Sequence, residues 1–251
     1  DGPRTLAALL NDGGFGATKL TVLEALGGPN ERIRTSLAAG FDLGDIGPLN
    51  VVALEVQASA HARVLSRAAG LPDALFEHDG QITKREIRAI TLSSLAPRKD
   101  ELLWDIGAGS GSIAIEWMLA DPSLRAIAIE QKPERATRIR RNAAAFGVPG
   151  LDVIEGQAPH CFAGLATPDA IFIGGGAAVP GLLDAVIAAL RSGGRLVANA
   201  VTLETEILLL ARHASQGGEL TRIALSRADG VGTKTGWRPA MPVTQWVWTK
   251  P

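Results

Sequence analysis

The segment Leu102–Gly111 (LLWDIGAGSG) constrains the fold of this chain more than any other part of the sequence. An apolar run ends near Asp105, and glycines then take every second position, at Gly107, Gly109 and Gly111, before a helical pattern begins. Glycine suits such a turn because a residue without Cβ lets a ligand come close to the backbone. The order of strand, tight turn and helix predicts a nucleotide-binding α/β unit.

A second apolar run, Ala126–Ile129, ends at Glu130, 19 residues after Gly111. A carboxylate at the end of the next strand can accept hydrogen bonds from both hydroxyls of a ribose. The turn and Glu130 together predict a cofactor that contains adenosine.

The spacing of the glycines distinguishes between two classes of cofactor. Dinucleotide-binding proteins have G-x-G-x-x-G and aim a helix N-terminus at a pyrophosphate. This chain has G-x-G-x-G, with Asp105 two positions before the first glycine. That pattern resembles motif I of the class I methyltransferases, whose cofactor is S-adenosylmethionine. A sulfonium cofactor has no phosphate, so its pocket needs close backbone approach and carboxylates. The pattern therefore favours a methyltransferase over a dinucleotide enzyme or a purely structural turn.

Composition excludes several other classes. The 251 residues suffice for one domain with an appendage. The net charge of -1 gives no general attraction to nucleic acid or anionic lipid. Cys161 is the only cysteine, which rules out an internal disulfide and suits a reducing cytoplasm, where we expect the protein to act. No apolar run is long enough to span a bilayer and no signal peptide is evident, so we expect no membrane association.

Two further expectations come from single residue types. The four histidines are scattered and no paired-cysteine motif accompanies them, so no metal site is predicted. The first residue is Asp1 and not methionine, so we expect a fragment or a processed chain.

From residue 71 onward, apolar strands alternate with helical patterns, which predicts a mostly parallel sheet. We expect strands near 102–106, 125–130, 151–155, 169–174 and 194–200. Helices are expected from Ser110 or Ser112 to Ala120, from Pro133 to Gly147 and from Pro180 to Leu190. Residues 221–250 are predicted to form two strands joined by a glycine-containing loop. A parallel sheet that ends in an antiparallel hairpin is the α/β, Rossmann-like architecture of class I methyltransferases.

Residues 1–57 differ from the remainder. We expect a helix over 20–26, a turn over 27–30 and a strand over 49–56, in a piece too short for its own core. Residues 58–70, rich in alanine and arginine, are predicted to be a helical linker. The class I methyltransferase domain would then occupy residues 71–251.

Several short motifs occur along the chain and together carry a family resemblance. In residues 71–250 they are Gly80–Arg88, Leu103–Ser112, Glu155–Pro159, Phe172–Gly176 and Asn199–Glu204, and in residues 18–57 they are Leu26–Arg32 and Leu49–Glu55. The first set resembles the decarboxylating precorrin-6Y methyltransferases of cobalamin (vitamin B12) biosynthesis. The second set looks like the tail of a tetrapyrrole methylase domain, which precedes the class I domain in the fused members of that family.

The resemblance implies a definite chemistry. The fused enzymes methylate carbons 5 and 15 of a precorrin ring and remove carbon dioxide from the acetate on carbon 12. Their C-terminal half is thought to perform the carbon 15 methylation and the decarboxylation. Because the methylase tail lacks its front half here, no carbon 5 activity is expected. The resemblance also implies a homo-oligomer, a tetramer.

The family's cofactor contacts can be carried over by motif. Glu130 stands where many relatives have aspartate, and Gln157 stands where an acidic residue is common, so its contact to adenine is left open. The implied contacts are Thr83, Gly107, Ala108, Gly109, Ser110, Gly111, Glu130 and Ala158.

A precorrin is large, flat and rich in carboxylates, so arginines and backbone amides should line its cleft beyond the carboxyl ends of the strands. Three glycines after the fourth strand allow close approach, Asn199 can orient a carboxylate or the methyl group, and a late loop offers cations and an indole. The substrate candidates are Gly174, Gly175, Gly176, Asn199, Lys234, Trp237 and Arg238. The sequence identifies no catalytic acid or base.

Most of these residues also have a structural interpretation. Gly174–Gly176 is equally typical of a strand-to-helix turn, and Trp237 of packing. Thr83 with Glu86 forms the pattern of a helix capping box. The basic run from Lys132 to Arg141 is typical of a solvated helix face, or it attracts an acidic substrate. Cys161 is expected to pack as a small hydrophobe, and Trp246 and Trp248 to share one sheet face.

Two other functions compete. A methyltransferase of RNA or protein is disfavoured because Gly174–Gly176 stands where base-methylating enzymes commonly carry an N-P-P-Y motif, and because the near-zero net charge does not suit RNA. The chain has no tyrosine at all. A catalytically silent module that binds the cofactor would keep the glycine turn and Glu130 but would lack a cleft lined by cations.

Overall fold

The computed structural model describes residues 2–251, so Asp1 lies outside the described part. The chain divides into two compact units between Leu65 and Ser66, inside the predicted linker. That linker was expected to be helical over residues 58–70, and this was wrong, because the segment contains no helix. Nearly all of its side chains are exposed or half-buried, and a helix without a packed face is marginal in water.

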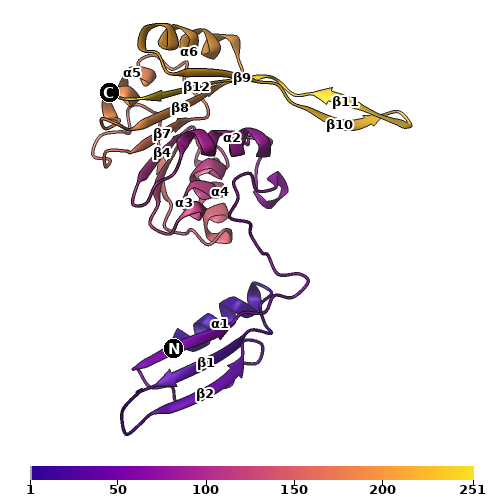
Figure 1. Cartoon of the computed structure of the whole chain (residues 1–251), viewed down its shortest axis with the longest axis vertical. Coiled ribbons are helices and arrows are strands. Elements are labelled where there is room, and N and C mark those ends of the chain that lie inside the picture. Colours follow the sequence, from indigo (N-terminus) through magenta and orange to yellow (C-terminus); the bar gives the residue numbers. More distant parts are fainter. Residues whose placement is uncertain (1) are drawn as a thin grey trace. The chain divides into compact units, whose positions relative to one another are not determined.

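The N-terminal unit consists of one helix and a three-stranded antiparallel sheet of order β2-β1-β3 (Figure 1). Its elements are α1 (Gly2–Asp12), β1 (Lys19–Glu24), β2 (Arg32–Leu37) and β3 (Asn50–Glu55). The helix predicted over 20–26 is strand β1, where Leu20, Val22 and Glu24 alternate inward. That period of two is a strand pattern. Ala7, Leu20 and Ala38 form a small core, so this piece does bury apolar side chains of its own.

The C-terminal unit is built on a seven-stranded sheet of order β6-β5-β4-β7-β8-β12-β9. The first five strands in this order are parallel, and β12 is antiparallel to both of its neighbours. The strands predicted in the sequence are confirmed to within two residues at each end. They are β4 (Leu102–Ile106), β5 (Arg125–Glu130), β6 (Asp152–Glu155), β7 (Ala170–Ile173) and β8 (Arg195–Ala200), followed by β9 (Glu219–Ile223) and β12 (Val243–Thr249).

Helices cover both faces of this sheet (Figure 1). On one face lie α2 (Arg85–Leu95), α3 (Ser112–Ala120) and α4 (Pro133–Ala145). On the other lie α5 (Leu182–Ala189) and α6 (Leu203–Gln216), against an extensive apolar cluster. Trp246 and Trp248 belong to that cluster with ring centroids 6.1 Å apart, so the prediction that they share one sheet face is confirmed.

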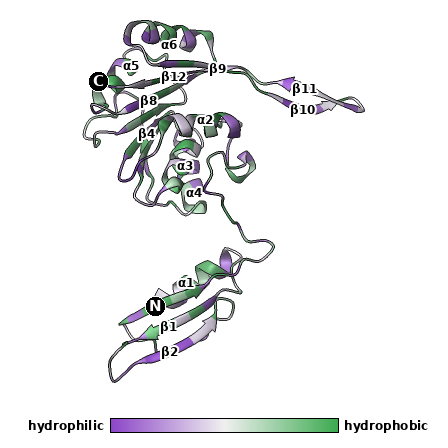
Figure 2. Ribbon diagram, in the orientation of Figure 1, coloured by the Kyte–Doolittle hydropathy of each residue, from purple (hydrophilic) through white to green (hydrophobic). Residues whose placement is uncertain are grey.

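Alternation along β4 decides which residues face which helices. Leu102, Trp104 and Ile106 belong to the cluster on the α5 and α6 side. Asp105 points to the opposite side, where it accepts a hydrogen bond from Ala114 at the start of α3. Both faces are covered, so β4 and β8 are mostly hydrophobic, apart from Asp105, Arg195 and Asn199 (Figure 2).

Between β9 and β12 the chain forms an additional hairpin, β10 (Ser226–Val231) and β11 (Lys234–Pro239). The sequence pattern predicted only a loop here, and this prediction was wrong. The two-residue turn at Gly232 and Thr233, where Gly232 has φ +60°, closes the hairpin in the way typical of tight β-turns. In Figure 1 the hairpin projects from the sheet as an arm, and we call residues 226–239 the arm.

Within residues 2–251, no helix has both the length and the apolarity that crossing a bilayer requires.

Candidate cofactor and substrate site

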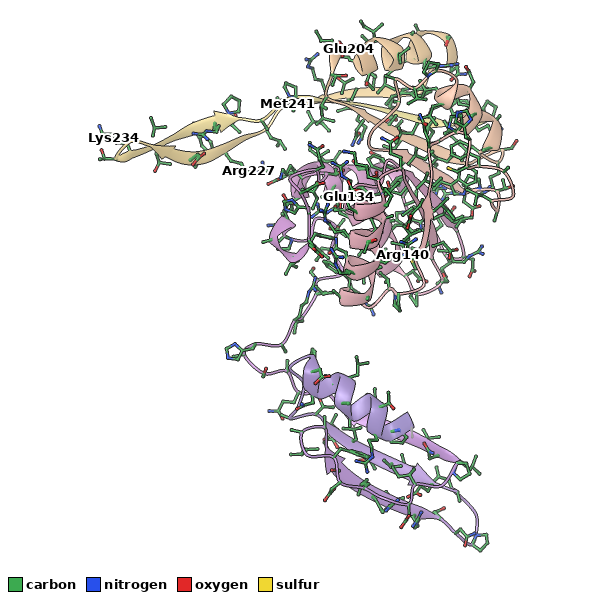
Figure 3. The ribbon with its side chains drawn as sticks, turned by 180° about the vertical axis from the view of Figure 1, so that it is seen from behind. Glu134, Arg140, Glu204, Arg227, Lys234 and Met241 are labelled. Carbon is green, nitrogen blue, oxygen red and sulfur yellow. The ribbon has the colours of Figure 1, made fainter. Side chains whose placement is uncertain are left out.

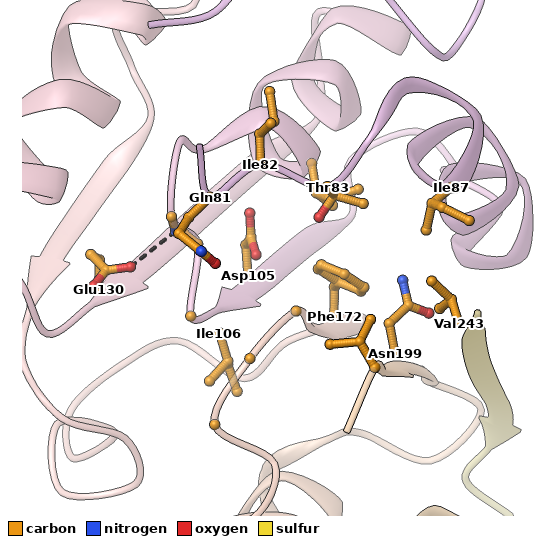
Figure 4. A pocket seen from close by; sticks show the side chains of 18 of the residues that line it. Gln81, Ile82, Thr83, Ile87, Asp105, Ile106, Glu130, Phe172, Asn199 and Val243 are labelled. Atoms are coloured by element: carbon orange, nitrogen blue, oxygen red, sulfur yellow. Dashed lines mark hydrogen bonds between the residues drawn. The ribbon is translucent and has the colours of Figure 1, made fainter. Parts of the chain in front are cut away.

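A cavity of about 550 Å³ opens at the carboxyl ends of the parallel strands, where the sequence analysis expected the cleft (Figure 4). Its floor includes the glycine turn after β4, Glu130 at the end of β5 and Asn199 on β8. Its sides are the segment before α2 and the base of the arm. This volume is in the range of sites for small molecules and cofactors.

Two glycines of the turn face the cavity with positive φ, and Gly107 has no room for a side chain. Gly107 has φ +70°, and a Cβ there would lie 2.9 Å from the carbonyl oxygen of Gly175. Gly109 has φ +61°, with a Cβ position 3.4 Å from the carbonyl oxygen of Gln81. The backbone of Gly107, Ala108 and Gly109 therefore forms a bare wall of the cavity, which a flat ligand can approach closely.

Gly111 has another role. A Cβ at this position would lie 2.8 Å from Cγ2 of Ile139, so the missing side chain lets the start of α3 approach α4. Gly111 and Ser110 do not line the cavity, although both are predicted cofactor contacts. The side chain of Ser110 is buried behind the turn.

Glu130 supports the turn and still faces the cavity. Its Oε2 accepts a hydrogen bond from the backbone N–H of Gly109 at 2.9 Å (Figure 4), and its Oε1 accepts one from the backbone N–H of Lys132 at 3.0 Å. The side chain is buried. Each carboxylate oxygen keeps a further lone pair, so Glu130 can accept two ligand hydroxyls.

Asp105 is the most perturbed ionisable group of the site. It is fully buried beside the cavity, and its Oδ2 accepts from the N–H of Ala114 at 3.1 Å. Its Oδ1 has no hydrogen-bond partner among the described residues. Burial, helped by the nearby charge of Glu130, raises the pKa of Asp105 to about 7. An unpartnered carboxylate oxygen at a cavity favours a ligand that brings a donor or a positive charge.

The segment before α2 is held by a buried arginine. Arg88 is completely buried and donates hydrogen bonds to the carbonyls of Leu71 and Thr83 as well as to Glu116. Glu116 also accepts from the backbone N–H groups of Gly70 and Leu71. This network fixes the loop that places Thr83 against the cavity.

The capping role considered for Thr83 was wrong. The N-cap of α2 is Lys84, and no side chain caps it. The capping box fails because Thr83 lies one residue before the N-cap, so Glu86 is not at the third helical position, and its carboxylate pairs with Arg227 on the arm. Thr83 lines the cavity all the same, as does Ala158, whose peptide bond to Pro159 is cis.

The predicted substrate residues after β7 and on β8 also lie at the cavity. Gly174, Gly175 and Gly176 line it, and a Cβ at Gly174 would come within 2.8 Å of the ring of Phe172. Asn199 donates to Oγ1 of Thr91 at 3.0 Å and accepts from Nε2 of Gln245 at 2.9 Å. These two bonds fix the orientation of its amide and leave one N–H and one lone pair available.

The three predicted substrate residues of the late loop lie elsewhere. Lys234, Trp237 and Arg238 are on β11 and do not line the cavity. Lys234 is at the far end of the arm (Figure 3), Trp237 is 77% exposed, and Arg238 pairs with Asp229 at 3.0 Å. They are displaced because residues 226–239 form a hairpin of their own and do not fold over the cleft. The alternative role considered for Trp237 was packing. Because this side chain is exposed, it does not pack against other parts of the chain.

The basic run on α4 is neutralised by acidic side chains of the same unit. Asp79 accepts from Arg135 at 2.9 Å and lies 3.2 Å from Arg138, which holds the pKa of Asp79 well below its usual range. Arg140 and Arg141 pair with Glu155 and Glu77. Of this run only Arg135 lines the cavity. Cys161 packs against the apolar cluster, where burial raises the pKa of its thiol, as expected of a small hydrophobe.

Several cavity residues were not predicted. Gln81, Ile82 and Lys84 stand in the motif Gly80–Arg88, of which only Thr83 was predicted as a contact. The remaining residues lie where the arm joins β9 and β12, which we call the base of the arm. No local sequence pattern predicts them, because only the tertiary fold brings them to the cavity. These are Ile223, Leu225, Arg227, Ala240, Met241 and Val243.

The sheet order, with β12 antiparallel beside β8, and the glycine turn flanked by Asp105 and Glu130 define a class I methyltransferase, the class that uses S-adenosylmethionine. Residues 74–250 match the family model described as a precorrin methyltransferase domain, and the chain belongs to that family.

Individual relatives agree with this assignment. The chain is 66% identical over 249 residues to a Sinorhizobium protein named precorrin-6Y C(5,15)-methyltransferase (decarboxylating), matching 99% of the chain but only 60% of that protein's length. It is 38% identical over 176 residues to a Saccharolobus solfataricus protein named probable cobalt-precorrin-6B C(15)-methyltransferase (decarboxylating), matching 66% of the chain and 87% of that protein.

A solved structure gives the same result. The C-terminal domain of precorrin-6Y C5,15-methyltransferase from Rhodobacter capsulatus has a TM-score of 0.70 and 46% identity, and the match covers 74% of this chain and all of that domain.

Proposed function

We propose that this chain methylates carbon 15 of a precorrin with S-adenosylmethionine and removes carbon dioxide from the acetate on carbon 12. The observation that carries the proposal is the cavity itself, which joins a bare glycine wall and two carboxylates to a mouth that carries cations. The Saccharolobus relative supports the division of labour. Its name contains only the carbon 15 methylation and the decarboxylation, and the match covers 87% of its length.

The residues that line the cavity suit S-adenosylmethionine. Bound S-adenosylmethionine supplies an electrophilic methyl group on a positively charged sulfur. Glu130 has free lone pairs for the ribose hydroxyls, and Oδ1 of Asp105 offers negative charge to the cationic part. Thr83, Gly107, Ala108, Gly109 and Ala158 line the pocket, while Ser110 and Gly111 hold the turn from behind.

The protein's main contribution to methyl transfer is alignment of the reacting groups. Positioning of this kind supplies on the order of 7–11 kcal/mol of a barrier. Gly174, Gly175 and Gly176 admit the flat macrocycle, and the fixed amide of Asn199 orients it. For the decarboxylation the C–C bond to the carboxylate breaks, the conjugated ring accepts its electron pair, and a proton from solvent or a positioned acid then completes the methyl group on carbon 12.

The proposal predicts a specific product from precorrin-6B, the 5-methylated intermediate. Incubation with this chain and S-adenosylmethionine should yield a product with one methyl group more and one carbon dioxide less, measured by mass spectrometry. A Glu130→Ala variant is the matched control and should give little product. Gain of the methyl group alone would remove decarboxylation from the proposal. An unchanged substrate, together with intact cofactor binding, would favour another acceptor or a silent module.

We further propose that residues 1–57 are the tail of a tetrapyrrole methylase domain. A separate proposal concerns assembly, namely that the chain forms a homotetramer through the arm. All arm residues in β10 and β11 except Gly236 are exposed, and an isolated two-stranded hairpin is marginally stable in water. The apolar side chains of Val231 and Trp237 are among the exposed ones. A second copy of this chain is the partner that would cover them.

If the arm forms the oligomer interface, a substitution in the arm should change the molecular mass of the protein in solution. Trp237→Asp should convert the oligomer to smaller species in light scattering after size exclusion, because it places a charge in the buried interface. Leu203→Asp, at another exposed apolar residue outside the arm, is the control and should leave the mass unchanged. A wild-type monomer, or an unchanged mass for Trp237→Asp, would contradict the hypothesis.

A further inference from the structure

We propose that Arg227 is the residue that recognises a carboxylate of the substrate, and that Glu86 occupies this arginine until the substrate replaces it. The inference rests on the proposed function, since it takes the ligand to be a polycarboxylate. It assigns the recognition to a residue at the base of the arm, where the sequence analysis had expected Lys234 and Arg238.

The position of the pair is the first argument. Arg227 lies on β10 and lines the cavity, and it donates a hydrogen bond to Glu86 in the first turn of α2. The two residues lie on opposite sides of the cavity mouth. Arg227 is at the base of the arm, and Glu86 follows the segment that carries Thr83. Figure 3 shows Arg227 at the base of the arm, close to α2 and far from Lys234 at the tip. A substrate that enters the cavity therefore passes this ion pair.

The exposure of the pair is the second argument. The side chains of Arg227 and Glu86 are 46% and 43% exposed. Ion pairs as exposed as this contribute about 0–1 kcal/mol, so exchange of Glu86 for another carboxylate costs little. Arg135, the other arginine that lines the cavity, is only 19% exposed and is held by Asp79, which Arg138 also contacts. Of these two guanidinium groups, Arg227 is the one free to change partner.

Charge at the mouth is the third argument. Lys84 lines the cavity beside Glu86 and forms no ion pair with any of residues 2–251. Arg227 and Lys84 therefore present two cations to an acidic ligand, and the planar guanidinium can bind a carboxylate with two parallel hydrogen bonds. Glu86 opposes this attraction, both by occupying Arg227 and by repelling carboxylates.

Opposite effects of two substitutions test the proposal. Arg227→Met should raise the KM for precorrin-6B by about 10- to 100-fold, as expected for loss of a charged hydrogen bond. Glu86→Gln should lower the KM by a few-fold, because it frees the arginine and removes a like charge. The affinity for S-adenosylmethionine, measured by calorimetry, should stay within about 2-fold in both variants.

The control is Arg222→Met on β9. Arg222 is also an exposed arginine paired with a helical glutamate, Glu206 at 2.9 Å, but it does not line the cavity. The Arg222→Met variant should leave the KM for precorrin-6B unchanged. If the Arg227–Glu86 pair merely braced the arm, both of its variants would shift the KM in the same direction. That result, or a KM for Arg227→Met equal to that of the control, overturns the proposal.

Failure of the proposed function can be separated from failure of this inference. If wild-type protein leaves precorrin-6B unchanged, the activity proposal fails, and binding of uroporphyrin III, a stable tetrapyrrole polycarboxylate, then decides about Arg227. Absorbance titration of the full chain should show weaker binding for Arg227→Met and tighter binding for Glu86→Gln. Shifts in one direction, or no binding to the wild type, overturn the inference.

Discussion

Replacement of Gly107 by alanine is expected to weaken S-adenosylmethionine binding by at least about 100-fold, which corresponds to about 3 kcal/mol. A left-handed conformation costs a residue with Cβ about 1–2 kcal/mol, and the new methyl group would lie 2.9 Å from the carbonyl oxygen of Gly175. That oxygen belongs to the backbone and cannot rotate away, so the turn itself must move. Isothermal titration calorimetry measures the loss.

Gly147→Ala separates backbone strain from the collision. Gly147 follows α4 with φ +76°, and a Cβ there meets no atom within 4 Å. This variant should lose about 1 kcal/mol of stability and keep its affinity for the cofactor. If Gly107→Ala binds S-adenosylmethionine as tightly as Gly147→Ala does, the glycine turn is not the wall of the cofactor site.

The second large effect concerns Asp105, whose replacement by asparagine should stabilise the protein above pH 7. The folded-state pKa of about 7 lies about 3 units above the usual 3.8, so the unfolded chain binds fewer protons between these values. Wild-type stability therefore falls as the pH rises from about 4 to about 7 and stays lower above. The asparagine variant has no charge to bury at this position, so the gain approaches at most about 4 kcal/mol.

Chemical denaturation at pH 6 and pH 8 measures this gain, which should be larger at pH 8. Asp121→Asn provides a control of the opposite sign, since hydrogen bonds from Ser123 lower the pKa of Asp121. Its removal should destabilise the protein at neutral pH, because the stability that the ionised carboxylate contributes is present above its unfolded pKa. An Asp105→Asn gain that is equal at both pH values would contradict the assignment of a buried, protonated carboxyl group.

The same carboxyl group should make cofactor binding depend on pH. A cationic ligand near Oδ1 favours the ionised form, so the wild-type affinity for S-adenosylmethionine should rise as the pH passes through about 7. The asparagine variant should bind more weakly at pH 8 and show a flat profile. Calorimetry over this pH range provides the measurement, and parallel profiles of the two proteins would exclude Asp105 as the titrating group.

Local patterns predicted the centre of the C-terminal unit well. The strands β4 and β5 lie within the predicted bounds because an apolar run buried on both faces is itself a strong signal. The turn after β4 was predicted because glycines at alternate positions after an apolar run are typical of a tight turn that a ligand can approach closely. Asp105 and Glu130 follow from the same short segments.

Where packing partners decide the structure, the predictions were wrong. Residues 20–26 were assigned to a helix on local composition, whereas pairing with β2 and β3 makes them a strand. The segment 58–70 has helix-forming alanines but no surface to pack against. The arm was interpreted as a loop because its glycines hide the alternation of β10 and β11.

Residue spacing was enough to establish the family, the parallel sheet and the cofactor end of the cavity, because those residues lie within short segments whose order carries the chemistry. The substrate end depends on the packing of distant segments. Arg227 meets Glu86 across 141 residues of sequence, and Lys234 and Arg238 leave the cavity because the arm carries them away. Contacts between residues so far apart depend on how the strands pair and where the arm emerges, and no local pattern contains that information.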